Sequence, residues 1–136
     1  MGSPRDFVEA LESAIELSTG LSKSKLILNA SLNPKQILDR VFSVEFKTMD
    51  TRKDMGQQRL YLGHDVAVSY VHIVDPHNQV KSRNDSLDIE SLLLKHIIPR
   101  GSNLPGYSVM FKSTERKLSP NRDYYLTTVN LNVEHY

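Results

Sequence analysis

The residues Glu45-Phe46-Lys47 come nearest, in type and spacing, to a catalytic arrangement. Apolar and polar residues alternate from Phe42 to Phe46, which predicts a strand with one buried face. On such a strand Glu45 and Lys47 share a face, where a carboxylate can hold Mg²⁺ and a lysine can orient water for phosphodiester cleavage. The nearest upstream acid, Asp39, belongs to a short predicted helix or follows it directly. A Glu and a Lys on a solvated strand face are a common pattern, so a Mg²⁺-dependent nuclease is an alternative hypothesis only.

Other chemical signals are weaker. His72 and His77 flank Asp75 across the end of a predicted strand, but their spacing does not fix them on one face, so we expect no metal site. The chain has no cysteine, which excludes a thiol nucleophile, a zinc ribbon and an iron–sulfur centre. The usual glycine-rich nucleotide and acyl-transfer motifs do not occur. We therefore expect no catalytic residue and no cofactor.

Composition limits the classes of partner. Seventeen basic residues face sixteen acidic ones, giving a formal net charge of +1. A general nucleic-acid binder carries a strong basic excess. The aromatic residues near the C-terminus fit packing in a sheet better than stacking on bases. In the adjacent pair Tyr124 and Tyr125, one ring lies on each face of a strand, so one of them is available for an interface.

Helical periodicity predicts two main helices. Residues 3–20 place apolar side chains on one stripe, with Pro4 at the start and Gly20 as a C-terminal stop. A second helix is expected from Asp85 or Ser86 to Pro99. A shorter helical signal begins at Asn33-Pro34 and reaches about Arg40, and residues 23–30 fit either a helix or a short strand.

Strands are expected at 41–47, at 59–74 and as a closing hairpin. The hairpin has arms at 107–111 and 124–133, with residues 116–123 as the connection. The polar segments 48–58 and 77–85 are expected to be mobile loops. The sequence therefore predicts a single domain, residues 1–136, of the α+β class. Its antiparallel or mixed sheet has four to five strands, with the N-terminal helix and the second helix packed on one face.

Targeting signals are lacking in the sequence. No run approaches the roughly 18 apolar residues of a membrane span, and acidic residues interrupt the N-terminal segment where a secretory signal would be apolar. We expect a soluble intracellular protein with no membrane partner. The polar segments hold many of the arginines, and arginine is enriched at protein interfaces. As a set, these segments indicate contacts with other proteins.

The order of elements resembles the tail terminator proteins of long-tailed bacteriophages, also called tail completion or tail-to-head joining proteins. The likeness spans almost the whole chain. It is carried by layout rather than by a signature motif, at residues 7–15, 42–46, 66–74, 87–98, 116–120 and 124–136. The resemblance implies a structural virion protein that forms a ring, expected to be a homohexamer, on the tail tube. Such a ring ends tube polymerisation and joins the tail to the head connector.

The resemblance also implies partners and places. The partners would be other copies of the chain, the tail tube protein and the head connector protein, with DNA only as passing cargo. The protein would work in the host cytoplasm during assembly and at the tail–head junction of the virion. For contacts with a partner or the lumen we expect Arg52, Lys53 and Arg59, and for the ring interface Arg116, Arg122 and Tyr124. A generic adaptor or scaffold domain in another assembly is the remaining alternative.

Overall fold

The computed structural model describes residues 4–28, 39–53, 60–96, 107–120 and 122–135. In chain order its elements are α1 (Pro4–Thr19), β1 (Ser22–Lys23), β2 (Val41–Lys53), β3 (Leu60–Ile73), α2 (Gln79–His96), β4 (Tyr107–Leu118) and β5 (Tyr124–His135). The strands form one sheet in the order β1-β2-β3-β5-β4. The pairs β2–β3, β3–β5 and β4–β5 are antiparallel, and β1 pairs with β2 in parallel. The predicted α+β class with a mixed sheet is confirmed.

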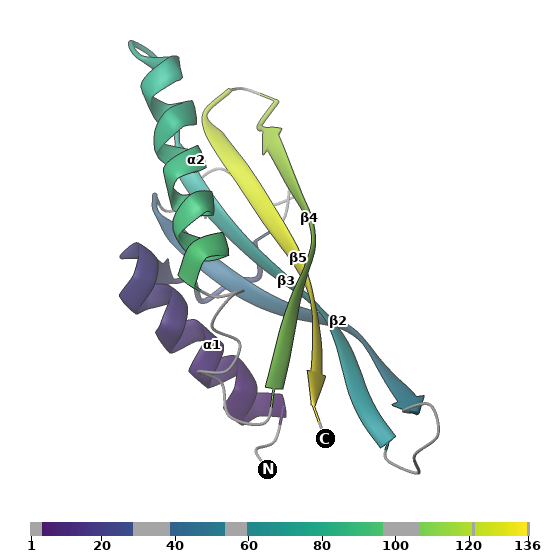
Figure 1. The fold of residues 1–136 in the computed structure, drawn as a ribbon. Coiled ribbons are helices and arrows are strands. Elements are labelled where there is room, and N and C mark those ends of the chain that lie inside the picture. The colour runs from purple at the N-terminus through teal and green to yellow at the C-terminus, as the bar shows by residue number, and fades with distance from the viewer. Residues whose placement is uncertain (1–3, 29–38, 54–59, 97–106, 121, 136) are drawn as a thin grey trace.

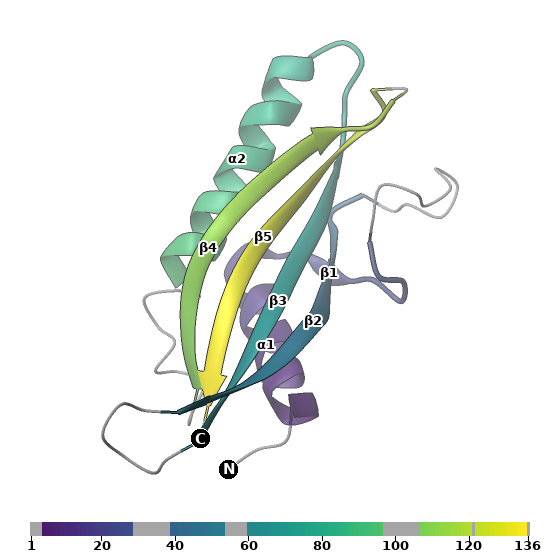
Figure 2. The same cartoon turned by 90° about the vertical axis from the view of Figure 1, so that its right-hand side faces the viewer.

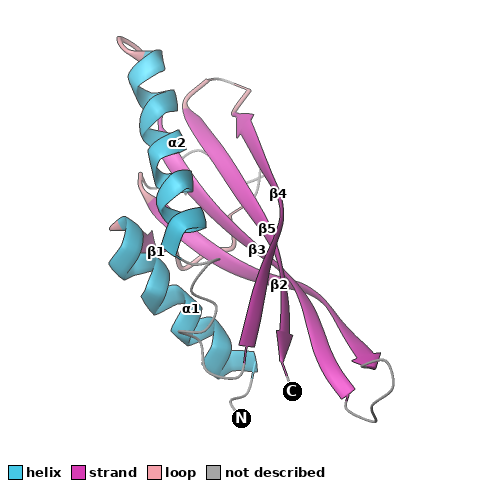
Figure 3. Ribbon diagram, in the orientation of Figure 1, coloured by secondary structure: helices cyan, strands magenta, loops and turns pink. Residues whose placement is uncertain are grey.

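Both helices lie on the same face of the sheet, which we call the helix face (Figures 1 and 3). From α1, the side chains of Phe7, Leu11 and Ile15 enter the core. They follow the period of one helical face, and α2 adds Ile89 and Leu93. The sheet supplies apolar side chains from β2, β3, β4 and β5, namely Phe42, Val66, Val68, Tyr70, Val109, Val129, Leu131 and Val133. The main core therefore lies between the helices and the sheet.

The opposite side of the sheet, which we call the outer face, carries no helix of the described part of the chain (Figure 2). A small second core covers one end of it, where Leu28 packs with Val71, Tyr124 and Leu126. The amide of Leu28 donates to Ser43 Oγ at 3.0 Å, which fixes the segment after β1 against β2. Within the described residues, neither helix combines the length and apolarity that crossing a membrane requires.

Local interactions define the C-terminus of α1 and the N-terminus of α2. Gly20 follows α1 with φ of 73°, a left-handed conformation that glycine adopts without strain, and its amide donates to Glu16 O at 3.0 Å. Asn78 caps α2, because its Oδ1 accepts from the Lys81 amide at 3.1 Å. These two caps explain why α1 stops and α2 starts where they do.

Two expected loops are corrected. Residues 48–53 belong to β2, because their backbone continues to pair with β3 as far as Lys53↔Leu60. Residues 79–85 belong to α2, because the cap at Asn78 starts that helix six residues before the expected Asp85. The hairpin connection is also shorter than expected, since β4 runs to Leu118. Of the expected helix at 33–40, residues 33–38 lie outside the described residues, and Asp39-Arg40 forms a turn.

Candidate functional site

A polar cluster joins α2 to the sheet beneath it. Arg116 of β4 places its guanidinium 3.2 Å from Glu90 Oε1 of α2 as an ion pair. Its Nε donates to Ser86 Oγ at 3.3 Å and to Thr127 Oγ1 at 3.2 Å. The two hydroxyls are 3.3 Å apart, and the Tyr70 hydroxyl donates to Ser86 O at 2.8 Å. These five residues, from β3, β4, β5 and α2, are called the polar cluster below.

The polar cluster is buried enough for the pairing of its charges to affect the stability of the fold. Ser86 and Thr127 are fully buried, and the side chains of Arg116 and Glu90 are each 19% exposed. A charge in such a place is costly unless it has a partner. Arg116 and Glu90 compensate each other, and the two hydroxyls accept from the guanidinium. The arrangement fixes α2 on the sheet.

Burial raises the pKa of the Tyr70 phenol above its ordinary value of 10.0, although Arg116 and the hydroxyls of Thr127 and Ser86 act in the opposite direction. Above pH 10 the unfolded chain therefore loses this proton while the folded protein keeps it. We expect the free energy of unfolding to fall as pH rises from 10, by at most about 1.4 kcal/mol per pH unit from this group. Chemical denaturation across this range should show a shallower fall for Tyr70→Phe. Identical slopes for the two proteins would contradict this role of Tyr70.

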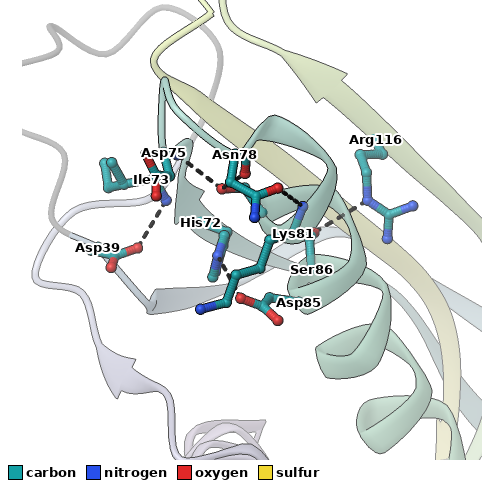
Figure 4. A network of polar contacts seen from close by, with 10 residues as sticks. Asp39, His72, Ile73, Asp75, Asn78, Lys81, Asp85, Ser86 and Arg116 are labelled. Atoms are coloured by element: carbon teal, nitrogen blue, oxygen red, sulfur yellow. Dashed lines mark hydrogen bonds and ion pairs between the residues drawn. The ribbon is translucent and has the colours of Figure 1, made fainter.

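A second group of polar contacts holds the start of α2 (Figure 4). The Asp75 amide donates to Ser82 Oγ at 2.8 Å, and the His77 amide donates to Asp75 Oδ1 at 2.9 Å. His72 Nε2 lies 3.9 Å from Asp85 Oδ2. The turn between β3 and α2 is thus tied to the first two turns of the helix.

The two histidines that flank Asp75 lie in different surroundings. His72 is buried on the helix face beside α2, and His77 is exposed in the turn. No group of three or more possible ligands occurs among the described residues.

On the outer face, hydroxyl and amide side chains bond to one another across strands. Ser69 Oγ and Thr128 Oγ1 are 3.1 Å apart, and Asn130 Nδ2 donates to Ser113 Oγ at 3.1 Å. Asp65 Oδ1 accepts from Lys112 Nζ at 3.3 Å and from Asn132 Nδ2 at 3.2 Å. The centre of the outer face therefore presents mainly short neutral polar groups. The charges of Asp65 and Lys112 on this face form an ion pair.

Asp39 and Glu45, the two acidic residues of the nuclease hypothesis, lie at separate places along the sheet. Asp39 Oδ1 accepts from the Ile73 amide at 2.8 Å, at one end of β3. Glu45 pairs with Ala67, six residues from Ile73 along the same strand, which is about 20 Å in an extended chain. The register of β2 against β3 also shifts between Phe46 and Thr48, so Lys47 is the extra residue of a bulge. The backbone register of β2 is therefore irregular directly after Phe46.

The residues expected to contact a partner lie at the end of the β2–β3 hairpin. The backbones of Arg52 and Lys53 pair with Tyr61 and Leu60, and Arg59 lies outside the described residues. This end of the hairpin projects away from both helices (Figure 1). Arg52 and Lys53, which were expected in a loop, thus lie near the end of a long two-stranded arm.

The three residues expected at a ring interface have different surroundings. Arg116 belongs to the polar cluster, and Tyr124 is only 5% exposed in the second core. Arg122 is exposed in the β4–β5 turn with φ of 59°. Two of the three side chains are thus engaged inside the protomer, and Arg122 is the one that reaches solvent.

Several structural residues were not anticipated. Glu90 and Ser86 appeared only as parts of a helix, and nothing in the spacing of Asp65 and Lys112, 47 positions apart, signals their contact. A strand pairing is needed to bring such residues together, and the sequence alone does not supply the strand order.

Comparison of the chain with protein-family models found no match, and comparison with curated proteins found none either.

Proposed function

We propose that the protein is a structural component of a long-tailed bacteriophage virion, a tail terminator that forms a ring on the tail tube. The observation that carries the proposal is the layout of the protomer. An N-terminal helix and a second helix share one face of a sheet that ends in a closing hairpin, as the resemblance implies. Helices on a single face leave the outer face and the long strands beside it for contacts with other copies.

The charge distribution suits this role. A net charge of +1 gives each copy little general attraction for phosphate. The centre of the outer face carries hydroxyl and amide groups bonded to one another. A ring through which DNA passes must release it, and weakly charged surfaces permit that. DNA is therefore cargo rather than a bound partner in this proposal.

Sedimentation of the purified protein over a wide concentration range, with and without Mg²⁺, tests the proposal, followed by electron microscopy of any large species. A closed ring of hexamer size supports it. Protein that stays monomeric and also fails to cap tail tubes assembled without it would overturn it. A parallel Mg²⁺-dependent cleavage assay with Glu45→Ala as the control separates the nuclease alternative.

The tip of the β2–β3 arm is proposed as the contact with the tube. Charge reversal by Arg52→Glu with Lys53→Glu is expected to weaken capping of tail tubes by about tenfold. It should leave the unfolding midpoint unchanged, because the tip lies away from the core. Capping is measured by counting overlong or uncapped tubes in electron micrographs. The matched control is Lys81→Glu with Lys95→Glu on the exposed surface of α2. Equal capping by the arm variant and the control would count against the assignment.

A further inference from the structure

In the part of the chain that the structure describes, the sheet ends on each side in a strand with an unpaired edge. β4 is the last strand on one side, over twelve residues. On the other side β1 pairs only with Val41 and Phe42. From Ser43 to Lys53, β2 therefore has a strand on one side only among the described residues. Unpaired strand edges are templates for pairing with another chain.

Around Phe111 the edge of β4 is not protected in the usual way, although the exposed Lys117 can guard the last part of the strand. Edge strands are commonly guarded by lysines that project from them. Lys112 stands at the bulge of β4, but its Nζ reaches across β5 to Asp65 of β3, at 3.3 Å. Its charge therefore lies over the outer face. The same strand exposes large apolar side chains, with Met110 51%, Phe111 45% and Leu118 39% exposed.

The two edges match each other in direction. Each of the three long strand pairs is antiparallel, so β4 runs opposite to β2 within one copy. If β4 of one copy lies beside β2 of the next in the same orientation, the new pair is antiparallel as well. The joint then has the same geometry as the pairs inside the protomer.

The side chains also match across the joint. On the helix face one row of directly paired residues crosses the four long strands and is entirely apolar: Phe46, Val66, Leu131 and Phe111. The half-exposed Phe111 stands at one end, and the partly buried Phe46 stands at the other. A second copy continues this row, because its Phe46 comes next to Phe111. A different partner strand would continue the apolar row only if it also placed an apolar residue beside Phe111.

We propose that copies of this chain assemble head to tail by antiparallel pairing of the β4 edge of one copy with the β2 edge of the next. The contact is heterologous, so it closes into a ring when the rotation between copies permits. The proposal deepens the proposed function by naming the ring contact, and it rests on that function only for closure into a ring.

Engineered disulfides test the pairing directly, because the chain has no cysteine. Glu45 and Ser113 are exposed ends of one row across the outer face, through Ala67 and Asn130. Within a copy, three strand spacings separate their Cα atoms by about 14 Å. A disulfide requires less than about 7 Å. The double variant Glu45→Cys with Ser113→Cys can therefore form its disulfide only between copies.

Two further double variants test other possible registers of the strand pairing between copies. They are Glu45→Cys with Met110→Cys and Glu45→Cys with Glu115→Cys. On mild oxidation at least one of the three should give a ladder of covalent dimers, trimers and larger species on denaturing gels. The single-cysteine variants stop at dimers. Leu17→Cys with Ser113→Cys is the matched control, because Leu17 is 89% exposed on α1, away from either edge.

A second measurement avoids cysteine chemistry. Phe111→Lys should shift the concentration for assembly in sedimentation upward by at least tenfold, whereas Leu17→Lys, an equally polar change at an exposed site, should not. A closed ring without a ladder from any edge pair would overturn the edge pairing and leave the ring. A ladder from open filaments would support the edge pairing and overturn the ring. Absence of both ladder and assembly would overturn the edge pairing, and the ring is overturned as well if the protein also fails to cap tail tubes.

Discussion

Replacing Arg116 by methionine is expected to lower the free energy of unfolding by about 2–3 kcal/mol. Loss of one partner of a fully buried ion pair costs about 3–5 kcal/mol. We expect a smaller loss than for a fully buried pair, because the Arg116 and Glu90 side chains are each 19% exposed. In the variant the Glu90 carboxylate loses its ion-pair partner, and Ser86 and Thr127 lose their common donor. Chemical denaturation at neutral pH measures the loss.

Two further variants show whether the loss comes from the unpaired carboxylate. Lys117→Met removes an exposed cation from the next position of β4 and should change stability by less than about 0.5 kcal/mol. Arg116→Met with Glu90→Met removes both charges together, and should recover most of the loss, because an apolar pair commonly replaces a buried ion pair without great cost. A double variant as unstable as Arg116→Met alone would contradict the account.

Truncation of Phe7 to alanine is expected to destabilise the protein by about 3–5 kcal/mol, the usual cost of removing a buried aromatic ring. Phe7 is 1% exposed, and its ring centroid lies 5.9 Å from that of Phe46. It is the largest side chain by which α1 docks on the sheet. The loss should appear as a lower denaturation midpoint with an unchanged slope.

The same helix offers the control for Phe7. Leu17 is 89% exposed, so Leu17→Ala should change stability by less than about 0.5 kcal/mol. Both substitutions put alanine into α1 and affect its intrinsic helix propensity little. Similar losses from both would mean that helix formation, rather than docking of the buried face, determines stability.

The sequence predicted those elements whose residues alternate or repeat against a core. α1, the first half of β2, β3 and the closing hairpin were found because one side of each is apolar. The extension of β2 from Thr48 to Lys53 was missed, since polar residues there give no period of two, and its pairing with β3 holds it as strand. The start of α2 was missed for a related reason: Gln79 to Asn84 is polar, and the cap at Asn78 determines the boundary.

The candidate interaction sites were less accessible to prediction. Arg116 was chosen as an interface residue because arginines are enriched there, but Glu90 lies on another element and binds it within the protomer. Tyr124 was chosen because one of two neighbouring rings must face outward. The structure buries Tyr124 under the segment that carries Leu28, which the sequence did not place on the outer face. Both outcomes depend on contacts between distant parts of the chain.

The strand order has a consequence for how the chain folds. β2–β3 and β4–β5 are hairpins of neighbouring strands, whereas β3 and β5 join residues more than 50 positions apart. Closing a long segment costs more conformational entropy than closing a short turn, and topologies rich in distant contacts fold more slowly. The two hairpins can therefore form early and independently. The pairing of β3 with β5 joins the two hairpins and determines which residues lie side by side across the sheet. We therefore expect formation of the correct β3–β5 register to be the slow step of folding.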